Sequence, residues 1–148
     1  MTTEVEERQM VVDEARTWLL TPYHSNADLK GAGVDCIRFI QRCFINAGLI
    51  GDFSIPHHSP QWALNQTSEL LLEGLGLYAH EVEIPLPADV AIFKVGKCWG
   101  HSSLVVSWPK LIHANPPGSC RYDNVEINSI LMRMTPRFFS IWPREPRS

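Results

Sequence analysis

Residues 33–47 read GVDCIRFIQRCFINA, and this stretch decides the fold of the chain. From Cys36 onward, apolar residues recur at the three- and four-residue spacing of an amphipathic helix. Asp35 is a good N-cap, and Gly48 fits the position just past a helix C-terminus. The stretch therefore predicts a helix over residues 36–47 whose first turn carries a cysteine.

The remaining patterns place helices early in the chain and strands late. Helical spacing predicts a first helix over residues 4–20 and a weaker one over residues 61–75, with a loop at residues 23–34. Short apolar runs predict strands over residues 89–93, 101–106, 110–114 and 138–142, and Trp108-Pro109 can make the turn between the middle two. This order predicts an α+β fold in which N-terminal helices pack on a C-terminal antiparallel sheet.

Length and composition exclude several classes of protein. The 148 residues fit a single domain, residues 1–148. A net charge of −3, with 13 mostly scattered Lys and Arg residues, argues against a nucleic-acid partner. No apolar run approaches the ~20 residues of a membrane helix, and the acidic N-terminus lacks the pattern of a secretory signal. We therefore expect synthesis in the cytoplasm without a signal peptide, and no membrane partner.

Four cysteines raise the question of metal binding or nucleophilic chemistry. Cys36, Cys43, Cys98 and Cys120 show no C-x-x-C pairing, so no metal site is expected. Cys36 sits where unpaired N–H groups and the helix dipole concentrate positive potential, which would lower a thiol pKa and hold an oxyanion. We expect its thiol to face the surface, Cys43 to lie in the core, and the other two cysteines to lie in loops. Most free cysteines are simply small buried residues, so position alone leaves both interpretations of Cys36 open.

Two histidines are the candidate partners of that cysteine. His101 opens one predicted strand and His113 lies in the next. Twelve residues separate them, an even number, which we expect to keep both on one face if no bulge intervenes. One imidazole would take the proton of Cys36, and the other would orient the first. A lone histidine is more often a satisfied core or surface group, but this arrangement of three residues favours catalysis.

Several short motifs, taken in order, resemble a known family. They are LTPY at residues 20–23, GVDC at 33–36, NAGL at 46–49, PADVAIF at 87–93, GHSSLVV at 100–106 and LIHA at 111–114. This ordered set resembles the NlpC/P60 cysteine peptidase domain over about residues 10–142. The resemblance implies a papain-like α+β fold and hydrolysis of amide bonds in peptidoglycan stem peptides, without a cofactor.

The resemblance also implies roles for individual residues. Cys36 would be the nucleophile, His101 the base and His113 the polar residue that orients it. Tyr23 would line the cleft near the oxyanion, and Asp35 would help to bind the free amine of the stem peptide. Many family members read Asp-Cys-Ser-Gly here, whereas this chain has Ile37 in place of the serine, and isoleucine cannot hydrogen-bond an amine.

The last part of the chain, residues 121–142, resembles the phage-tail and gene-transfer-agent branch of that family. This implies a tail-associated cell-wall peptidase with phage-like tail proteins as partners. Three alternatives remain: an interbacterial amidase toxin, a thiol acyltransferase, and a non-catalytic tail assembly module. The joint presence of Cys36, His101 and His113 counts against the last, because a scaffold needs none of them.

Overall fold

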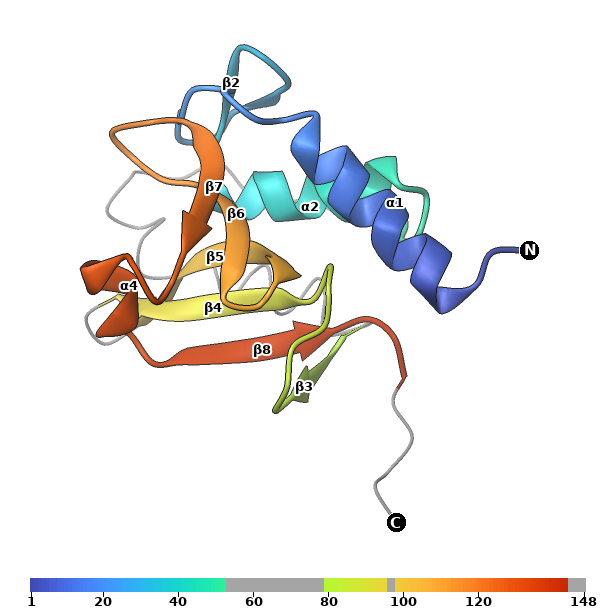
Figure 1. Ribbon diagram of the computed structural model, residues 1–148. Coiled ribbons are helices and arrows are strands. Elements are labelled where there is room, and N and C mark those ends of the chain that lie inside the picture. Colours follow the sequence, from blue (N-terminus) through green and yellow to red (C-terminus); the bar gives the residue numbers. More distant parts are fainter. Residues whose placement is uncertain (53–78, 96–97, 144–148) are drawn as a thin grey trace.

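The computed structural model describes residues 1–52, 79–95 and 98–143 of the chain (Figure 1). The predicted helix over residues 61–75 lies outside these described residues. Within them, no helix combines the length and the apolar character that crossing a membrane requires.

Helix α1 spans Glu4–Arg16 and begins with a capping box. The Glu6 amide donates to the Thr3 hydroxyl at 3.2 Å, and the Thr3 amide donates to the Glu6 carboxylate at 3.4 Å. The helix ends before residue 20, where the sequence predicts its end. Leu20 has left-handed backbone geometry (φ 73°), and its amide donates to the carbonyl of Cys120 at 2.8 Å. This tertiary hydrogen bond draws the last predicted turn out of the helix.

Helix α2 spans Cys36–Asn46, as the sequence predicts to within a residue. The side chain of Asp35 caps it by accepting the Arg38 amide at 2.8 Å. Gly48 follows the helix with φ +80°, a conformation that costs glycine nothing. The helix buries an apolar face against the sheet, formed by Ile37, Phe39, Ile40, Cys43 and Phe44.

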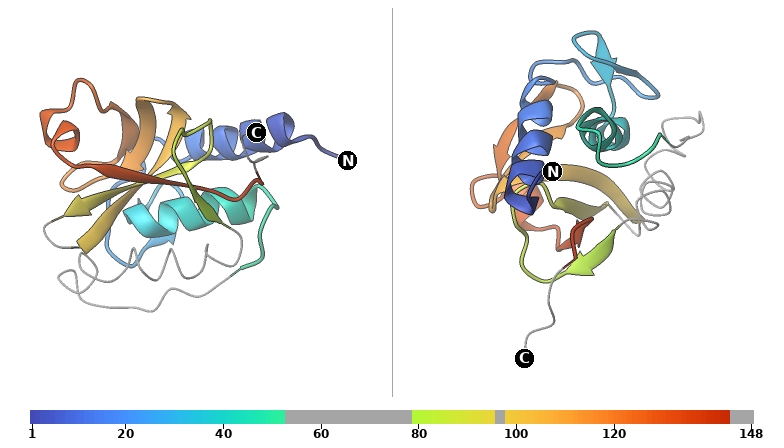
Figure 2. Two further views of the ribbon diagram at one scale, coloured as in Figure 1. Left: turned by 90° about the horizontal axis from the view of Figure 1, so that it is seen from below. Right: turned by 90° about the vertical axis from the view of Figure 1, so that its right-hand side faces the viewer.

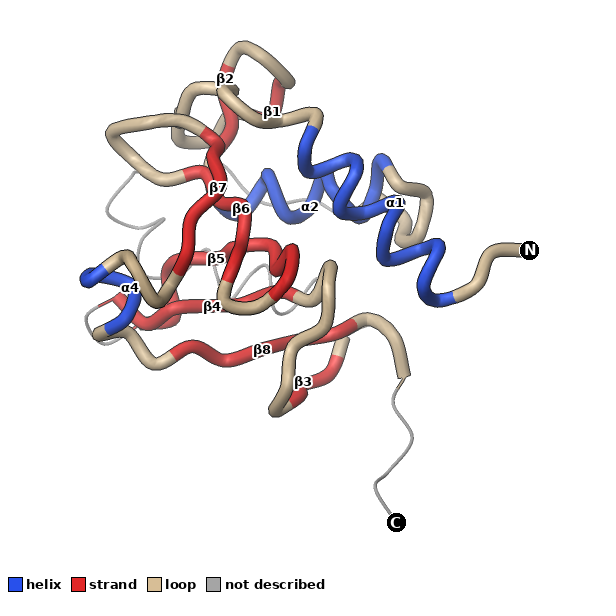
Figure 3. The backbone as a smooth tube through the Cα atoms, in the orientation of Figure 1, coloured by secondary structure: helices blue, strands red, loops and turns tan. Residues whose placement is uncertain are grey.

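Six strands form one antiparallel sheet in the order β3-β8-β4-β5-β6-β7 (Figures 1 and 3). Their bounds are His80–Val82 for β3, Val90–Val95 for β4, Cys98–Ser107 for β5, Lys110–Ala114 for β6, Cys120–Asn124 for β7 and Pro136–Ser140 for β8. A two-stranded hairpin, β1 (Asp28–Leu29) and β2 (Gly33–Val34), lies inside the predicted loop. Helix α4 (Ser129–Met132) connects β7 to β8.

The predicted fold class is confirmed: helices precede an antiparallel sheet and pack on it. All four predicted strands are present, with bounds shifted by a few residues. Strands β3 and β7 are not in the sequence prediction. The expectation that Cys98 and Cys120 lie in loops is wrong, because they open β5 and β7, and Cys120 is fully buried.

The sheet has an apolar core on each face. Helices α1 and α2 lie together over one face (Figures 1 and 2), where Ile92, Leu104 and Ile112 pack with them. On the other face, Ala91, Phe93, Val105 and Leu111 pack with Val125 and Leu131 near α4. Alternate residues of β4, β5 and β6 therefore serve two different cores. The sheet therefore separates the core beneath α1 and α2 from the core near α4.

A buried arginine ties α1 to distant segments of the chain. Arg8 donates to the carboxylate of Asp89 at 2.8 Å, to the carbonyl of Pro87 at 2.7 Å and to the hydroxyl of Ser140 at 3.3 Å. Its guanidinium also lies 4.3 Å from the ring centroid of Trp142. Residues from the two ends of the described chain thus meet at one side chain.

Candidate active site

Cys36 lies at the first position of α2 and its side chain is buried, with 8% of the residue exposed. The expectation of a surface-facing thiol is therefore wrong. The expected low pKa is wrong as well: burial, with a smaller contribution from the charge of Asp35, raises the pKa of the Cys36 thiol to about 11. Hydrogen bonding from Ser102 acts in the opposite direction and is outweighed. The resting cysteine is a neutral thiol that needs a base to become a nucleophile.

Ser102 holds the start of α2 against strand β5. Its hydroxyl donates to the carbonyl oxygen of Cys36 at 2.8 Å, and the serine is fully buried. Because Ser102 follows His101 directly, this bond places the main chain of Cys36 beside the segment that carries the histidine. Ser102 is not among the residues predicted from the sequence, although a polar residue on the helix-facing side of an apolar strand is a signal for such a bond.

His101 and His113 are brought together by a short hydrogen bond. Nε2 of His101 lies 2.7 Å from Nδ1 of His113, and their ring centroids are 4.9 Å apart. Both rings are buried, with 9% of His101 and none of His113 exposed. The two predicted histidines are therefore direct partners.

The reason for their shared face differs from the one expected. Across the turn, Ser107 pairs with Lys110, and in that register partners are an odd number of residues apart. An unbroken hairpin would put residues twelve apart on opposite faces. The register shifts between Val105 and Ser107, so that Val105 pairs with Leu111, an even separation. The bulge at Val106, and not its absence, brings the histidines to one face.

The environment of His101 keeps its imidazole neutral. Phe93 is its partner on β4, and the two ring centroids are 6.2 Å apart. Burial lowers the pKa of His101 to about 3, helped by His113 and Arg121 and opposed by Asp123. Burial is also the main cause that lowers the pKa of His113. A neutral imidazole is the protonation state that a general base requires.

Asp123, which is not among the residues predicted from the sequence, extends this pair into a chain of three hydrogen-bonded groups. Its Oδ2 lies 2.9 Å from Nε2 of His113 and accepts the Asn128 side-chain amide at 2.8 Å. Its Oδ1 accepts the Asn124 backbone amide at 2.8 Å. Burial alone would raise the pKa of Asp123, but these hydrogen bonds together bring it below its ordinary value. The group is therefore a carboxylate at neutral pH.

Tyr23 approaches the same site from the loop before α2. It pairs with Val34 in an isolated bridge, and its amide donates to the carbonyl of Gly118 at 3.1 Å. Burial, then the charges of Cys36 and Asp35, raise the pKa of Tyr23 to about 12. Its phenol is thus a protonated hydrogen-bond donor near the thiol.

Asp35 is already bonded within the protein. Its Oδ2 accepts the Arg38 guanidinium at 2.7 Å and the Asn26 amide at 2.9 Å, while Oδ1 accepts the Arg38 amide. The side chains of Asp35 and Arg38 are only 8% and 6% exposed. The negative charge next to Cys36 is therefore compensated internally.

Within the described residues, no hydrogen bond joins the Cys36 sulfur to either imidazole. Catalytic hydrogen bonds in unliganded enzymes are often long and tighten when substrate binds. The structure thus assembles the histidine pair fully, and it holds the main chain of Cys36 against Ser102, the residue that follows His101 on β5.

Comparison with known proteins identifies the fold. No family model matches the sequence, and no curated protein matches it. Among solved structures, the chain is similar to the NlpC/p60 domain of the peptidoglycan hydrolase SagA, with a TM-score of 0.58, 17% identity, and coverage of 88% of this chain and 96% of that one. It is also similar to NlpC2 from Trichomonas vaginalis, with a TM-score of 0.66 and 15% identity; the match covers 94% of this chain but 47% of that longer one.

RipD from Mycobacterium tuberculosis, described as a non-catalytic NlpC/p60 domain protein, matches with a TM-score of 0.58 and 13% identity over 92% of this chain and 98% of that one. The chain therefore has a papain-like α+β fold. More particularly, it has the fold of NlpC/P60 domain proteins, as the sequence motifs indicate.

Proposed function

We propose that this protein is a cysteine hydrolase that cleaves amide bonds in peptidoglycan stem peptides. The observation that carries the proposal is the histidine pair at 2.7 Å, together with the hydrogen bond from Ser102, the residue after His101, to the main chain of Cys36. A buried thiol at a helix N-terminus and a neutral imidazole are the two groups that nucleophilic attack on a carbonyl needs. Peptidoglycan is supported as substrate by the sequence motifs and by the fold shared with the SagA domain.

In the proposed reaction, the Sγ–H bond of Cys36 breaks and its proton moves to Nδ1 of His101. The thiolate attacks the scissile carbonyl carbon, and the carbonyl electron pair moves to oxygen. The amides of Cys36 and Ile37, which precede the two amides that Asp35 accepts, and the phenol of Tyr23 are the candidate donors to this oxyanion. The C–N bond then breaks, the leaving amine takes the proton from His101, and a thioester remains on Cys36.

Water completes the cycle. His101 accepts a proton from the water molecule as its oxygen attacks the thioester carbonyl. Collapse of the second tetrahedral intermediate breaks the C–S bond and releases the carboxylic acid, and the thiolate regains its proton from His101. His113 takes no proton in either half of the reaction and orients the base.

We propose further that the substrate group bound next to Asp35 is uncharged. A free carboxylate would favour an ammonium group, but Arg38 compensates this carboxylate and both of its oxygens accept protein N–H groups. A substrate ammonium would have to displace a buried guanidinium to bind there. Stem peptides in which the amine is acylated should therefore be cleaved at least as well as those in which it is free.

The test is digestion of purified peptidoglycan followed by mass analysis of the fragments. The wild-type protein should release fragments cut at one amide bond, and Cys36→Ala should release none. Cys43→Ala is the matched control, because it removes a fully buried thiol from the same helix without touching the site. Cleavage by Cys36→Ala, or its absence in the wild type, would overturn the proposal.

The proposed place of action is a phage-like tail, supported by the resemblance of residues 121–142 to that branch of the family. The alternatives make different predictions in the same digest. A non-catalytic module, as RipD is described, would bind peptidoglycan and leave it intact. A thiol acyltransferase would form the acyl-enzyme and transfer it to an added amine in preference to water.

A further inference from the structure

We propose that Asp123 is a positioning residue that sets the direction of the hydrogen-bond chain through His113 and thereby leaves the lone pair of His101 on Nδ1. The proposal rests on the proposed function, in which His101 is the base. Its evidence is the continuous chain of short contacts from His101 to His113 to Asp123, at 2.7 Å and 2.9 Å.

The direction of the chain follows from the chemistry at its end. A carboxylate accepts hydrogen bonds and cannot donate them, so Nε2 of His113 must carry a hydrogen. Since a neutral imidazole has one N–H, Nδ1 of His113 is then the acceptor in the bond to His101. Nε2 of His101 must therefore be the donor, and its Nδ1 is left bare. One carboxylate thus fixes both tautomers.

Without that carboxylate, the hydrogen bond between the two histidines could have either of them as its donor. In the reversed arrangement Nδ1 of His113 donates to Nε2 of His101, and the hydrogen of His101 moves to Nδ1. An imidazole in that form has no lone pair at Nδ1 and cannot accept the thiol proton of Cys36 there. The fixed direction therefore decides whether the base is ready before substrate arrives.

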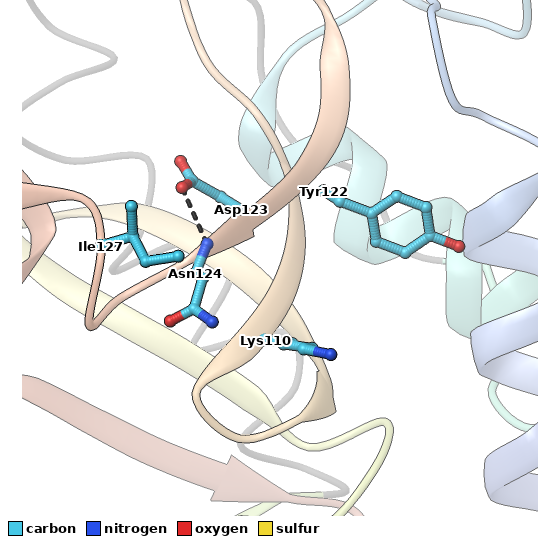
Figure 4. A pocket seen from close by; sticks show the side chains of 5 residues that line it. All are labelled: Lys110, Tyr122, Asp123, Asn124 and Ile127. Carbon is cyan, nitrogen blue, oxygen red and sulfur yellow. Dashed lines mark hydrogen bonds between the residues drawn. The ribbon is translucent and has the colours of Figure 1, made fainter.

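The local structure holds Asp123 firmly in this role. Its two oxygens accept from Asn128 and from the Asn124 amide, which fixes the plane of the carboxylate. Figure 4 shows Asp123 and Ile127 on one side of β7 and Tyr122 on the other, at a pocket of about 520 Å³. The Asp123 side chain is 17% exposed, whereas that of His113 is fully buried. This hydrogen-bond chain therefore connects the buried His101 to a partly exposed carboxylate whose orientation is fixed.

Asp123 also acts on the charged form of the base. When His101 takes the thiol proton it becomes a cation in a buried site, close to His113 and to the cationic Arg121, which disfavours it. Asp123 is the negative group that opposes this effect on both histidines. Loss of the carboxylate should slow Cys36 activation by about 10- to 100-fold, the range known for hydrogen-bond partners of metal-bound histidines, taken here as the guide.

The first test reads the tautomers directly by NMR of protein labelled with ¹⁵N-histidine. At neutral pH, ring nitrogen shifts and two-bond couplings should show His101 and His113 both protonated at Nε2 and bare at Nδ1. In Asp123→Ala, a fraction of both rings should carry the hydrogen on Nδ1. Protonation of Nδ1 on either ring of the wild type would overturn the proposal.

The second test measures alkylation of Cys36 by iodoacetamide at pH 7, mapped to its peptide by mass spectrometry. Asp123→Ala and Asp123→Asn should both alkylate more slowly, by about 10- to 100-fold for alanine and less for asparagine, whose amide oxygen can still accept from His113. Glu81→Gln is the control: its carboxylate bonds Arg137 at 2.6 Å across β3 and β8, at the opposite edge of the sheet. Its alkylation rate should equal that of the wild type.

These tests separate this inference from the proposed function. An Asp123→Ala protein that melts as the wild type does and alkylates within twofold of its rate would refute the positioning role. If Asp123→Ala is unstable, Asp123→Asn decides: slower alkylation with some Nδ1-protonated imidazole supports the positioning role, and a rate and tautomers equal to those of the wild type refute it. If alkylation depends on Asp123 but the wild type cleaves no peptidoglycan, the substrate assignment fails and the positioning role stands.

Discussion

Replacing Arg38 with methionine removes the cation that compensates Asp35 beside the nucleophile. The guanidinium and carboxylate are 2.7 Å apart, with side chains 6% and 8% exposed. Breaking a buried ion pair costs about 3–5 kcal/mol because it leaves an uncompensated charge in the protein. The amides of Asn26 and of residue 38 itself still donate to the carboxylate after the substitution. We therefore expect the lower end of that range, about 3 kcal/mol of the free energy of unfolding.

The assay is urea and thermal unfolding of Arg38→Met beside a matched control on the same helix. A loss of about 3 kcal/mol corresponds to a Tm lower by roughly 6–12 °C in a protein of this size. Arg42→Met breaks an ion pair with Asp28 at a similar distance, 2.8 Å, but those side chains are 28% and 40% exposed. Exposed pairs contribute about 0–1 kcal/mol. If the two variants lose equal stability, the argument from burial is refuted.

A double variant separates the unpaired charge from lost packing. Asp35→Asn keeps a good helix cap while removing the charge. Combined with Arg38→Met, it should recover most of the stability that the single Arg38→Met variant loses, because no buried charge is left without a partner. A double variant less stable than either single variant would show that packing dominates.

Three further results are expected. Cys36→Ala should abolish hydrolysis with the fold intact, His101→Ala should be nearly as damaging, and His113→Ala should be milder because it takes no proton; equal loss in both histidine variants would contradict these roles. Tyr23→Phe should lower kcat by up to about 100-fold at unchanged Tm if the phenol donates to the oxyanion, and an unchanged kcat would exclude that donation. Burial holds the pKa of His101 at about 3, against 6.5 for an ordinary histidine, so between these values the unfolded chain binds a proton that the native protein does not. Stability should therefore fall as pH falls below 6.5, by at most about 1.4 kcal/mol per pH unit from this group, and urea unfolding at pH 7 and pH 5 should show a smaller fall in His101→Gln.

The sequence predicted the elements in which apolar spacing and end signals agree. Helix α2 is the clearest case, since its cap, its apolar face and Gly48 all indicate the same bounds. Strand β7 was missed because its five residues, CRYDN, hold only two apolar side chains and no β-branched residue, too weak a signal for a strand. One of its polar side chains is Asp123, which bonds His113. Hydrophobic periodicity fails where a strand carries polar groups for the site.

The candidate site was likewise predicted from the sequence only in part. The sequence identified Cys36, His101 and His113, because a helix start and two neighbouring strands are local features. It could not determine the burial of the thiol, which depends on how the rest of the chain packs around the helix start. Nor could it determine the register at Val106, because a bulge depends on pairing between strands and not on spacing along one of them.

The contacts of Arg8 bear on when the protein can fold during its synthesis. Its partners Asp89 and Ser140 follow it by 81 and 132 residues, and Trp142 lies two residues beyond the second. A nascent chain that has exposed only its helices cannot form these contacts, whatever their local helical tendency. Strand β8, which lies between β3 and β4, also leaves the ribosome after the other strands of this sheet. Native assembly of the thiol and histidines on one framework therefore awaits the synthesis of β8 and Trp142, and a partly made chain carries its cysteine without the ordered site that would make it reactive.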